Sequence, residues 1–336
     1  SGSFDVTQWY GVDEVRGEAY YQAASRSARQ REVFRVKLTG GKASAIAKDA
    51  PWNGADFSSS FDFYVLTTQE GNRPARYSLH QRNGQQVRIL EDNPLFNAGR
   101  GAVLTHEGHA ELDASIMTGH DLKAGAVAGV KRIRHPINLA RKVMEDSPHV
   151  MLYGAGAEEF ASSRGFEFVP NEFFITPQRK QQLERVLQGR TQPRNELSGL
   201  GTVGAVAIDS SGNLAAATST GGMTNKRWGR IGDAPIIGAG TYANNASCAV
   251  SATGHGEYFI RSVVAYDVCA LMEYKGYTLD RAATEVVKRK LVERGGEGGI
   301  IAVDRAGNVA LEFNSPGMFR GMRDSAGRRE IAIYEK

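Results

Sequence analysis

The stretch from Gly201 to Asp209 constrains this chain most strongly. Thr202 stands at its head, and the residues after it are small or apolar, a pattern typical of a β-strand. The preceding segment, residues 176–201, is polar, its charges are mostly basic, and glycine and proline interrupt it, which indicates a flexible surface connector. Within it, Leu183, Val186 and Leu187 predict at most a brief helical stripe. We predict that the Gly201–Thr202 peptide bond is cut, and that Thr202 then becomes the N-terminal nucleophile of an amidohydrolase.

A threonine at a new N-terminus is a much better nucleophile than a threonine within a chain. Its α-amino group has a pKa of about 7.7–8.0, so a useful fraction is neutral and accepts the hydroxyl proton. Before cleavage the same hydroxyl must attack the preceding carbonyl, and Gly201 has no side chain to obstruct it. A Gly-Thr pair also occurs at ordinary strand starts, so the hypothesis depends on residues further along the chain.

Composition excludes several other classes of protein. The 336 residues, 41% hydrophobic and 23% charged, are typical of a globular protein with one large domain or two ordinary ones. The basic residues behind the net charge of +4 are spread along the chain, so we expect a solvated surface and no nucleic-acid partner. No apolar run reaches the roughly 18 residues that cross a bilayer, so we expect no membrane-spanning segment.

The two cysteines, Cys248 and Cys269, have no metal-ligand spacing. We expect both to be buried as small apolar residues in a reducing, cytoplasmic setting.

Residues 1–93 have β character. Aromatic and β-branched runs at residues 19–24, 32–38 and 62–67 predict strands, and Gly40-Gly41 and Asn83-Gly84 predict tight reversals. The segment resembles the β-propeller domain of bacterial dipeptidyl peptidase IV-like proteins over about two blades. The motifs that carry this resemblance are Gly11-Val12-Asp13-Glu14, Arg31-Glu32-Val33-Phe34-Arg35-Val36, Ala55-Asp56-Phe57-Ser58, Phe61-Asp62-Phe63-Tyr64-Val65, Tyr77-Ser78-Leu79 and Val87-Arg88-Ile89-Leu90-Glu91-Asp92-Asn93. No Gly-x-Ser-x-Gly nucleophile motif is present, so that family's peptidase activity is not expected here. Because the resemblance is to a propeller, a periplasmic setting stays open.

From Pro94 the pattern changes to alternating strands and helices rich in glycine and alanine, which predicts a layered α/β domain. Pro136 and Pro148 bracket a predicted helix, and residues 150–153 predict a short buried strand. Apolar residues at helical spacing predict one helix near residues 259–271 and a second, capped by Thr278, that continues to Leu291. Residues 202–219 and 301–310 repeat one hairpin pattern, so we expect adjacent parts of one antiparallel layer.

Six motifs in the second part occur together in a fixed order. They are Asn97-Ala98-Gly99, Glu111-Leu112-Asp113-Ala114, Gly201-Thr202-Val203-Gly204-Ala205-Val206, Ser219-Thr220-Gly221-Gly222, Gly229-Arg230-Ile231-Gly232-Asp233 and Thr253-Gly254-His255-Gly256-Glu257. Each is weak alone, but together residues 94–336 resemble the plant-type asparaginase and isoaspartyl peptidase family of N-terminal nucleophile hydrolases. The resemblance implies an α+β fold, a four-layer αββα sandwich, made of an α-subunit part (94–201) and a β-subunit (202–336).

The resemblance implies a role for each matching residue. Thr202 is the nucleophile, Thr220 and Asn97 lie beside it, and Thr253 and Gly254 form the oxyanion hole. Arg230 binds the substrate α-carboxylate, while Asp233 and the Gly256 carbonyl bind its α-ammonium. A surface ion pair between Arg230 and Asp233 is the alternative.

The resemblance also implies a structural sodium ion and a homodimer of cleaved protomers. The ion would be bound by the backbone carbonyls of Leu90, Glu91, Asn93, Phe96, Ala98 and Arg100. The expected substrates are L-asparagine and β-aspartyl dipeptides, with no catalytic cofactor.

The chain departs from the family upstream of Leu90. An apolar strand leading into His-Gly-Gly-Ala-Gly and a long helix are replaced by a predicted hairpin at residues 78–89. We infer a chimera that joins the two resemblances near residues 90–93. The alternative function is an inert hydrolase half fused to a β segment that binds a partner or belongs to a dipeptidyl peptidase IV-like protein.

Overall fold

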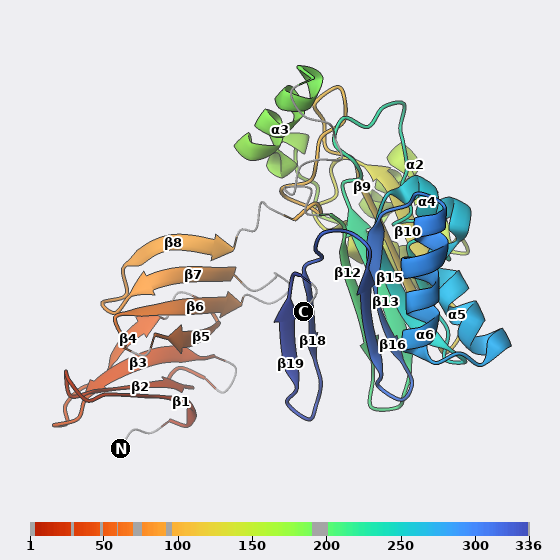
Figure 1. Ribbon diagram of the computed structural model, residues 1–336. Helices are drawn as coiled ribbons and strands as arrows, with labels where there is room; N and C mark the ends of the chain where they lie inside the picture. Colours follow the sequence, from red (N-terminus) through yellow and green to blue (C-terminus); the bar gives the residue numbers. More distant parts are fainter. Residues whose placement is uncertain are drawn as a thin grey trace. The chain divides into compact units, whose positions relative to one another are not determined.

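The computed structural model describes residues 4–27, 30–47, 50–58, 60–69, 76–91, 96–189 and 201–334. The chain divides into two compact units, residues 1–93 and 94–336, which are described separately (Figure 1).

The first unit contains two consecutive four-stranded antiparallel meanders. The first sheet consists of β1 (Val6–Asp13), β2 (Glu18–Ala23), β3 (Glu32–Lys37) and β4 (Ser44–Ala47). The second consists of β5 (Trp52–Phe57), β6 (Phe63–Gln69), β7 (Arg76–Gln81) and β8 (Gln86–Glu91). The strands and the hairpin predicted from sequence are confirmed, but the part of this unit that is described forms no closed propeller.

Aromatic rings fill the interior of the first unit. Tyr20 is fully buried, and its ring centroid lies 4.7 Å from that of Phe57 and 5.0 Å from that of Phe61. Phe57 in turn lies 5.1 Å from Tyr64, which belongs to a core with Val33, Ala47 and Leu66. Such pairs stabilise strands beyond the area they bury, so large rings hold this unit together.

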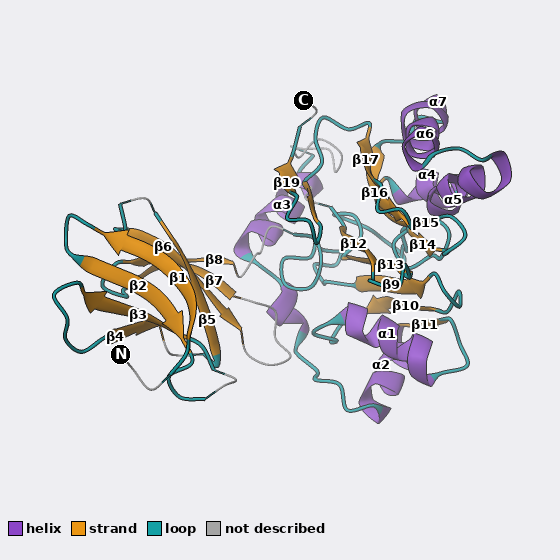
Figure 2. Cartoon of the chain, turned by 90° about the horizontal axis from the view of Figure 1, so that it is seen from below, coloured by secondary structure: helices purple, strands orange, loops and turns teal. Residues whose placement is uncertain are grey.

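The second unit has two facing sheets (Figure 2). The first has the order β11-β10-β9-β13-β12, and its strands are β9 (Leu112–Thr118), β10 (Ala124–Val130), β11 (Met151–Tyr153), β12 (Val203–Ile208) and β13 (Leu214–Thr220). The second has the order β14-β15-β16-β17, and its strands are β14 (Thr241–Ala243), β15 (Cys248–Gly254), β16 (Gly298–Asp304) and β17 (Val309–Phe313). A further hairpin joins β18 (Arg320–Arg323) and β19 (Arg329–Ala332).

Helices cover the outer faces of both sheets, so the unit has four layers. The first sheet is covered by α1 (Pro136–Asp146) and α2 (Gly154–Ser163), with the short turn η1 (Asn171–Phe174) and α3 (Pro177–Leu187) following. The second is covered by α4 (Gly256–Ser262), α5 (Val264–Lys275), α6 (Leu279–Thr284), η2 (Glu285–Lys290) and α7 (Leu291–Glu293). A third apolar cluster, which includes Met117, Ala216 and Ala249, lies between the two sheets.

Small residues set the spacing of these layers. A Cβ atom on Gly125 of β10 would lie 2.1 Å from the carbonyl oxygen of Ala140 in α1, so only glycine permits this approach of helix and strand.

The structure corrects the predicted connector at residues 176–201. Residues 177–187 form α3, whose first turn is capped because Thr176 Oγ1 accepts a hydrogen bond from the Arg179 N–H. Arg179 is buried and donates from Nε to the Gly101 carbonyl over 2.6 Å. The helix is polar in composition but is fixed by these hydrogen bonds, which the apolar pattern does not reveal; residues 190–200 lie outside the described part.

Three further predictions were wrong in part. The helix expected near residues 259–271 is divided into α4 and α5 at Val263, which has a left-handed φ of 50°. The short strand β11 is not buried, because Met151 and Tyr153 are exposed at the sheet edge. The repeated hairpins belong to opposite sheets that face each other. Their turns are joined by a hydrogen bond from Arg305 Nε to the Gly212 carbonyl, and Val206 and Val303 share the apolar cluster between the sheets.

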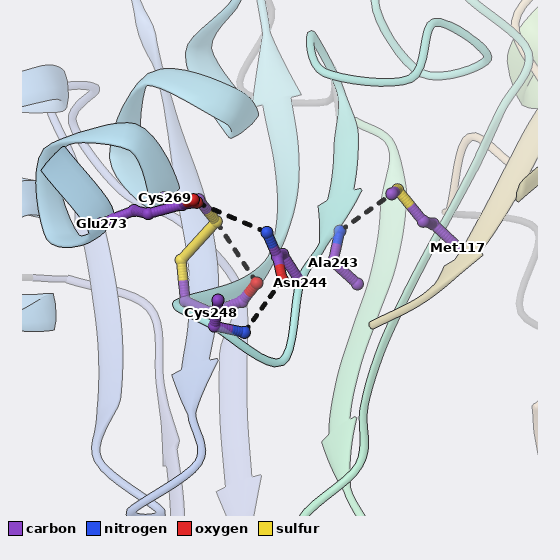
Figure 3. The surroundings of a disulfide bond; sticks show 7 residues. Met117, Ala243, Asn244, Cys248, Cys269 and Glu273 are labelled. Atoms are coloured by element: carbon purple, nitrogen blue, oxygen red, sulfur yellow. Dashed lines mark hydrogen bonds between the residues drawn. A yellow bond between two sulfur atoms is a disulfide. The ribbon is translucent and has the colours of Figure 1, made fainter. Parts of the chain in front are cut away.

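The expected burial of the two cysteines is confirmed, but they are not free thiols, because Cys248 and Cys269 form a disulfide (Figure 3). Cys248 begins β15 and Cys269 lies in α5, within the core between this helix layer and the second sheet. Their Cα atoms are 5.6 Å apart although 21 residues separate them in sequence. Disulfides persist in oxidising compartments, so the cysteines no longer support a reducing setting.

Candidate active site

The predicted nucleophile lies at the edge of the first sheet. Thr202 directly precedes β12, which pairs with β13 so that Val203 lies opposite Ser219. This register brings Thr202 to Thr220, and the two hydroxyl oxygens are 3.3 Å apart. Two hydroxyls predicted from separate motifs are therefore neighbours.

Asn97 and a glycine turn fix the position of Thr220. Asn97 Nδ2 lies 3.4 Å from Thr220 Oγ1 and donates over 2.6 Å to the Gly222 carbonyl. The Gly222 N–H also donates to Thr220 Oγ1, over 3.0 Å. A Cβ atom on Gly221 would lie 2.5 Å from Asn97 Oδ1, so glycine is required for this approach.

Thr253 and Gly254 end β15 in the facing sheet. Two residues before Thr253, Ser251 contacts Thr218, which lies two residues before Thr220. Side chains two apart on a strand share a face, so this contact places Thr253 toward the same end of the sandwich as Thr220. Gly254 has a φ of 156° and a Cβ there would lie 2.5 Å from the Glu297 carbonyl, so this position also requires glycine.

Arg230, Asp233 and Gly256 also meet. A Cβ atom on Gly256 would lie 2.7 Å from Arg230 Nη2 and 3.0 Å from Asp233 Oδ1. Arg230 forms a bidentate pair with Glu257, with distances of 2.9 and 3.0 Å from Nε and Nη2 to the two carboxylate oxygens. The expected alternative of an ion pair with Asp233 is not formed. Glu257 was quoted in a motif but given no role, because sequence does not show which carboxylate Arg230 meets.

Asp233 is suited to bind a cation. Its side chain is buried, and Oδ2 has no hydrogen-bond partner among the described residues. Burial raises the pKa of its carboxyl to about 7, against the opposing effects of its own backbone N–H and Arg230. A substrate ammonium would supply the missing partner and favour the ionised form.

A second buried group lies beneath the site and was missed by sequence reasoning. Asp113 lies opposite Thr220 in the sheet register, and its Oδ1 accepts a hydrogen bond from the Gly129 N–H over 2.8 Å. Burial raises the pKa of Asp113 and lowers that of Lys226, whose Nζ donates to the Glu111 carbonyl over 3.0 Å. The sequence analysis includes Asp113 in a family motif but predicts no role for it, because nothing in the sequence indicates that it is buried.

The carbonyls expected to bind sodium lie in two units. Leu90 and Glu91 belong to β8 of the first unit, Asn93 lies outside the described residues, and Phe96, Ala98 and Arg100 belong to the second unit. Between the last three, the carbonyls of Asn97 and Gly99 accept hydrogen bonds from Gly221 and Ala102. The carbonyls of Asn97 and Gly99 thus alternate along the chain with those of Phe96, Ala98 and Arg100. No group of three or more His, Cys, Asp or Glu side chains in the described part could hold a metal ion.

A four-layer αββα sandwich with a threonine at the start of an edge strand defines the class of N-terminal nucleophile hydrolases. Comparison with known proteins gives the family. Residues 83–333 match the asparaginase family. The isoaspartyl peptidase of Salmonella typhimurium is 56% identical over 259 residues, which cover 75% of this chain and 83% of the relative. The isoaspartyl peptidase of Escherichia coli is 54% identical over 75% of this chain and 81% of its own length. The isoaspartyl peptidase/L-asparaginase of Rattus norvegicus is 46% identical over 69% of this chain and 70% of its own length. The chain belongs to the asparaginase family.

The first unit has a different relationship. Residues 1–75 match the N-terminal region of dipeptidyl peptidase IV. The asparaginase match begins at residue 83, in the turn between β7 and β8, so the two matches do not overlap. Among the described residues no helix is long and apolar enough to cross a membrane.

Proposed function

We propose that this chain is a self-cleaving amidohydrolase that splits L-asparagine and β-aspartyl dipeptides through an acyl-Thr202 intermediate. The contact between the Thr202 and Thr220 hydroxyls, at the end of the sandwich toward which Thr253 also lies, carries the proposal. The names of the bacterial and rat relatives support activity on β-aspartyl peptides, and the name of the rat relative also supports L-asparaginase activity.

Maturation would begin at the Thr202 hydroxyl. Its oxygen attacks the Gly201 carbonyl carbon, and the hydroxyl proton passes to the Thr202 nitrogen as the C–N bond breaks. The upstream chain is then held as an ester on Thr202 Oγ1. Water hydrolyses this ester, which leaves a free α-amine on Thr202. The Thr220 hydroxyl, fixed by Asn97 and Gly222, positions the attacking oxygen.

Turnover would use the new amine as the base. It accepts the Thr202 proton while Oγ1 attacks the β-carbonyl carbon of the substrate, and Thr253 and the Gly254 N–H stabilise the oxyanion. The proton passes to the leaving nitrogen, and ammonia or an amino acid departs. Water then hydrolyses the β-aspartyl ester and releases aspartate.

Arg230 and Asp233 would select the substrate by its two backbone charges. Arg230 binds the α-carboxylate, and Asp233, with the Gly256 carbonyl, binds the α-ammonium. The bidentate pair with Glu257 holds the guanidinium in place beside Gly256.

Denaturing electrophoresis and product assays test this proposal together. Fragments 1–201 and 202–336 should appear, with ammonia released from asparagine and free amino acid from β-aspartyl dipeptides. A single intact band from a chain that still hydrolyses these peptides would refute the acyl-threonine mechanism. Absence of both products would favour the inert fusion.

We further propose a homodimer of cleaved protomers, which size-exclusion chromatography with light scattering tests.

We also propose that the backbone carbonyls of Phe96, Ala98 and Arg100 bind a sodium ion. Replacing sodium by choline should lower the melting temperature of the second unit if this ion is structural.

A further inference from the structure

Four buried hydroxyl side chains meet between the two sheets, just behind the site. Ser115 and Thr218 lie opposite each other on β9 and β13, and Thr241 and Ser251 lie opposite each other on β14 and β15. None is more than 2% exposed. We name these four residues the hydroxyl square.

The hydrogen bonds of the square cross from one sheet to the other. Thr218 Oγ1 lies 2.7 Å from Ser251 Oγ, accepts from the Thr241 hydroxyl, and lies 3.0 Å from the Gly240 carbonyl, to which it donates. One donor and two acceptor positions are all that a hydroxyl has, so Thr218 is saturated. Ser115 Oγ lies 2.6 Å from the Ala234 carbonyl and 2.7 Å from Thr241 Oγ1.

A glycine makes room for this arrangement. Gly204 lies opposite Thr218 on β12, and a Cβ atom there would lie 2.2 Å from Ser251 Oγ. Any larger residue would displace Ser251 or push the sheets apart.

The hydroxyl square lies directly beside the predicted catalytic and binding residues along the chain. Thr218, Gly204 and Ser251 each lie two residues before or after a predicted catalytic threonine, namely Thr220, Thr202 and Thr253. Ala234, whose carbonyl meets Ser115, directly follows Asp233. One step in the other direction, at Met117, Ala216, Ala243 and Ala249, the space between the sheets is apolar. Hydrogen bonds between side-chain hydroxyls therefore replace apolar contact in the layer that adjoins the site.

We propose that Thr218 and Ser115 are positioning residues: the hydroxyl square aligns the strand of Thr220 with that of Thr253 and fixes the loop of Asp233. This inference rests on the proposed function and deepens it. Thr218 controls the geometry of nucleophile and oxyanion hole, and so acts on kcat. Ser115 controls the Asp233 loop, and so acts on KM.

The test compares Thr218→Val with Thr218→Ser. Valine keeps the β-branched shape and removes the hydroxyl, whereas serine keeps the hydroxyl. A shift of about 1 Å in a reacting group costs on the order of 100-fold in rate, so Thr218→Val should lower kcat by about 10- to 100-fold with KM nearly unchanged. Thr218→Ser should restore most of kcat, and Ser115→Ala should raise KM more than it lowers kcat.

Two controls separate positioning from simple loss of stability. Val143→Ala removes buried methyl groups from the α1 core, away from the square, and should leave kcat and KM unchanged. Hydrogen exchange should accelerate in peptides covering residues 216–222 and 249–256 of Thr218→Val and stay at the wild-type rate in Thr218→Ser.

Equal losses of kcat in Thr218→Val and Val143→Ala, or unchanged exchange in both peptides, would overturn the inference. Inactivity of the wild-type chain toward both substrates would instead overturn the proposed function, and the exchange measurement would still decide whether the square aligns the strands.

Discussion

The two units of this chain use opposite means to pack β-sheets. In the first, large rings such as Tyr20 and Phe57 fill the interior. In the second, glycine, alanine and small hydroxyl residues let backbones approach so closely that a Cβ on Gly204 or Gly125 would collide with its neighbour. Close approach brings polar groups of several strands within hydrogen-bond distance, so the second unit can assemble a reaction site.

The largest expected effect tests whether the second unit carries the activity. Thr202→Ala should stop self-cleavage and lower hydrolysis by on the order of 10⁴-fold or more, since it removes the atom that forms the acyl intermediate. Intact mass spectrometry checks the cleavage, and ammonia release checks the hydrolysis.

Thr202→Ser is the matched control for this substitution. It keeps a hydroxyl and an N-terminal amine, so slow cleavage and measurable turnover should remain. If Thr202→Ala turned over substrate at close to the wild-type rate, Thr202 would not be the nucleophile. The assignment of the activity to this site of the second unit would then be wrong.

The next effect concerns Asp233. Because its pKa is raised to about 7, the carboxylate that we propose binds the substrate ammonium forms only as pH rises through neutrality. KM for asparagine should therefore fall between pH 6 and 8 in the wild type. Asp233→Asn should raise KM by on the order of 100-fold, about 2.7 kcal/mol, and remove this dependence on pH. Steady-state kinetics across this range measures both changes.

The same pKa predicts a change in stability. Between the ordinary pKa of 3.8 and the raised value of about 7, the folded state binds more protons at Asp233 than the unfolded state does. This residue therefore lowers the free energy of unfolding as pH rises through that window. Denaturant unfolding at several pH values should show that the free energy of unfolding falls less with rising pH in Asp233→Asn than in the wild type. An equal dependence on pH in the two proteins would contradict the raised pKa.

Arg230 should give a smaller effect. Arg230→Lys loses the planar fork that pairs with Glu257, so KM should rise by about 10-fold while kcat changes less. Glu257→Gln leaves the guanidinium in place and should change KM only a few-fold. If Glu257→Gln costs as much as Arg230→Lys, the carboxylate itself belongs to the binding site.

The local sequence pattern correctly predicted several strands and helices of the two units. Aromatic and β-branched runs predicted β2, β3 and β6, and Pro136 and Pro148 predicted the bounds of α1. These features depend on residues close in sequence, whose spacing reports which side of an element is buried.

Contacts between distant residues were the part that local pattern did not predict. The disulfide joins residues from two layers, the pair of Arg230 with Glu257 spans 27 positions, and the hydroxyl square unites four strands. Helix α3 is longer than the brief stripe expected from its apolar residues, because its buried residues also include Arg179 and Gln182, whose burial depends on hydrogen bonds and not on apolarity. The order of the motifs suggested which residues share a site. The hydrogen-bond, ion-pair and disulfide partners of each side chain became visible only in the fold.

The smallest effect on activity should come from a substitution in the first unit. It tests whether the packing of this unit is independent of the activity of the second unit. Tyr20 is fully buried among rings, so Tyr20→Ala should lower the free energy of unfolding of the first unit by about 3–5 kcal/mol. Two of the three tryptophans, Trp9 and Trp52, lie in this unit, so fluorescence mainly follows its unfolding while ammonia release follows the second unit. Tyr20→Phe removes only the hydroxyl that donates to Glu18 and should cost about 1 kcal/mol. Fluorescence should then report an earlier transition in Tyr20→Ala while kcat and KM stay at wild-type values. A parallel loss of activity would mean that the aromatic unit supports the site, and that the two packing modes are not independent.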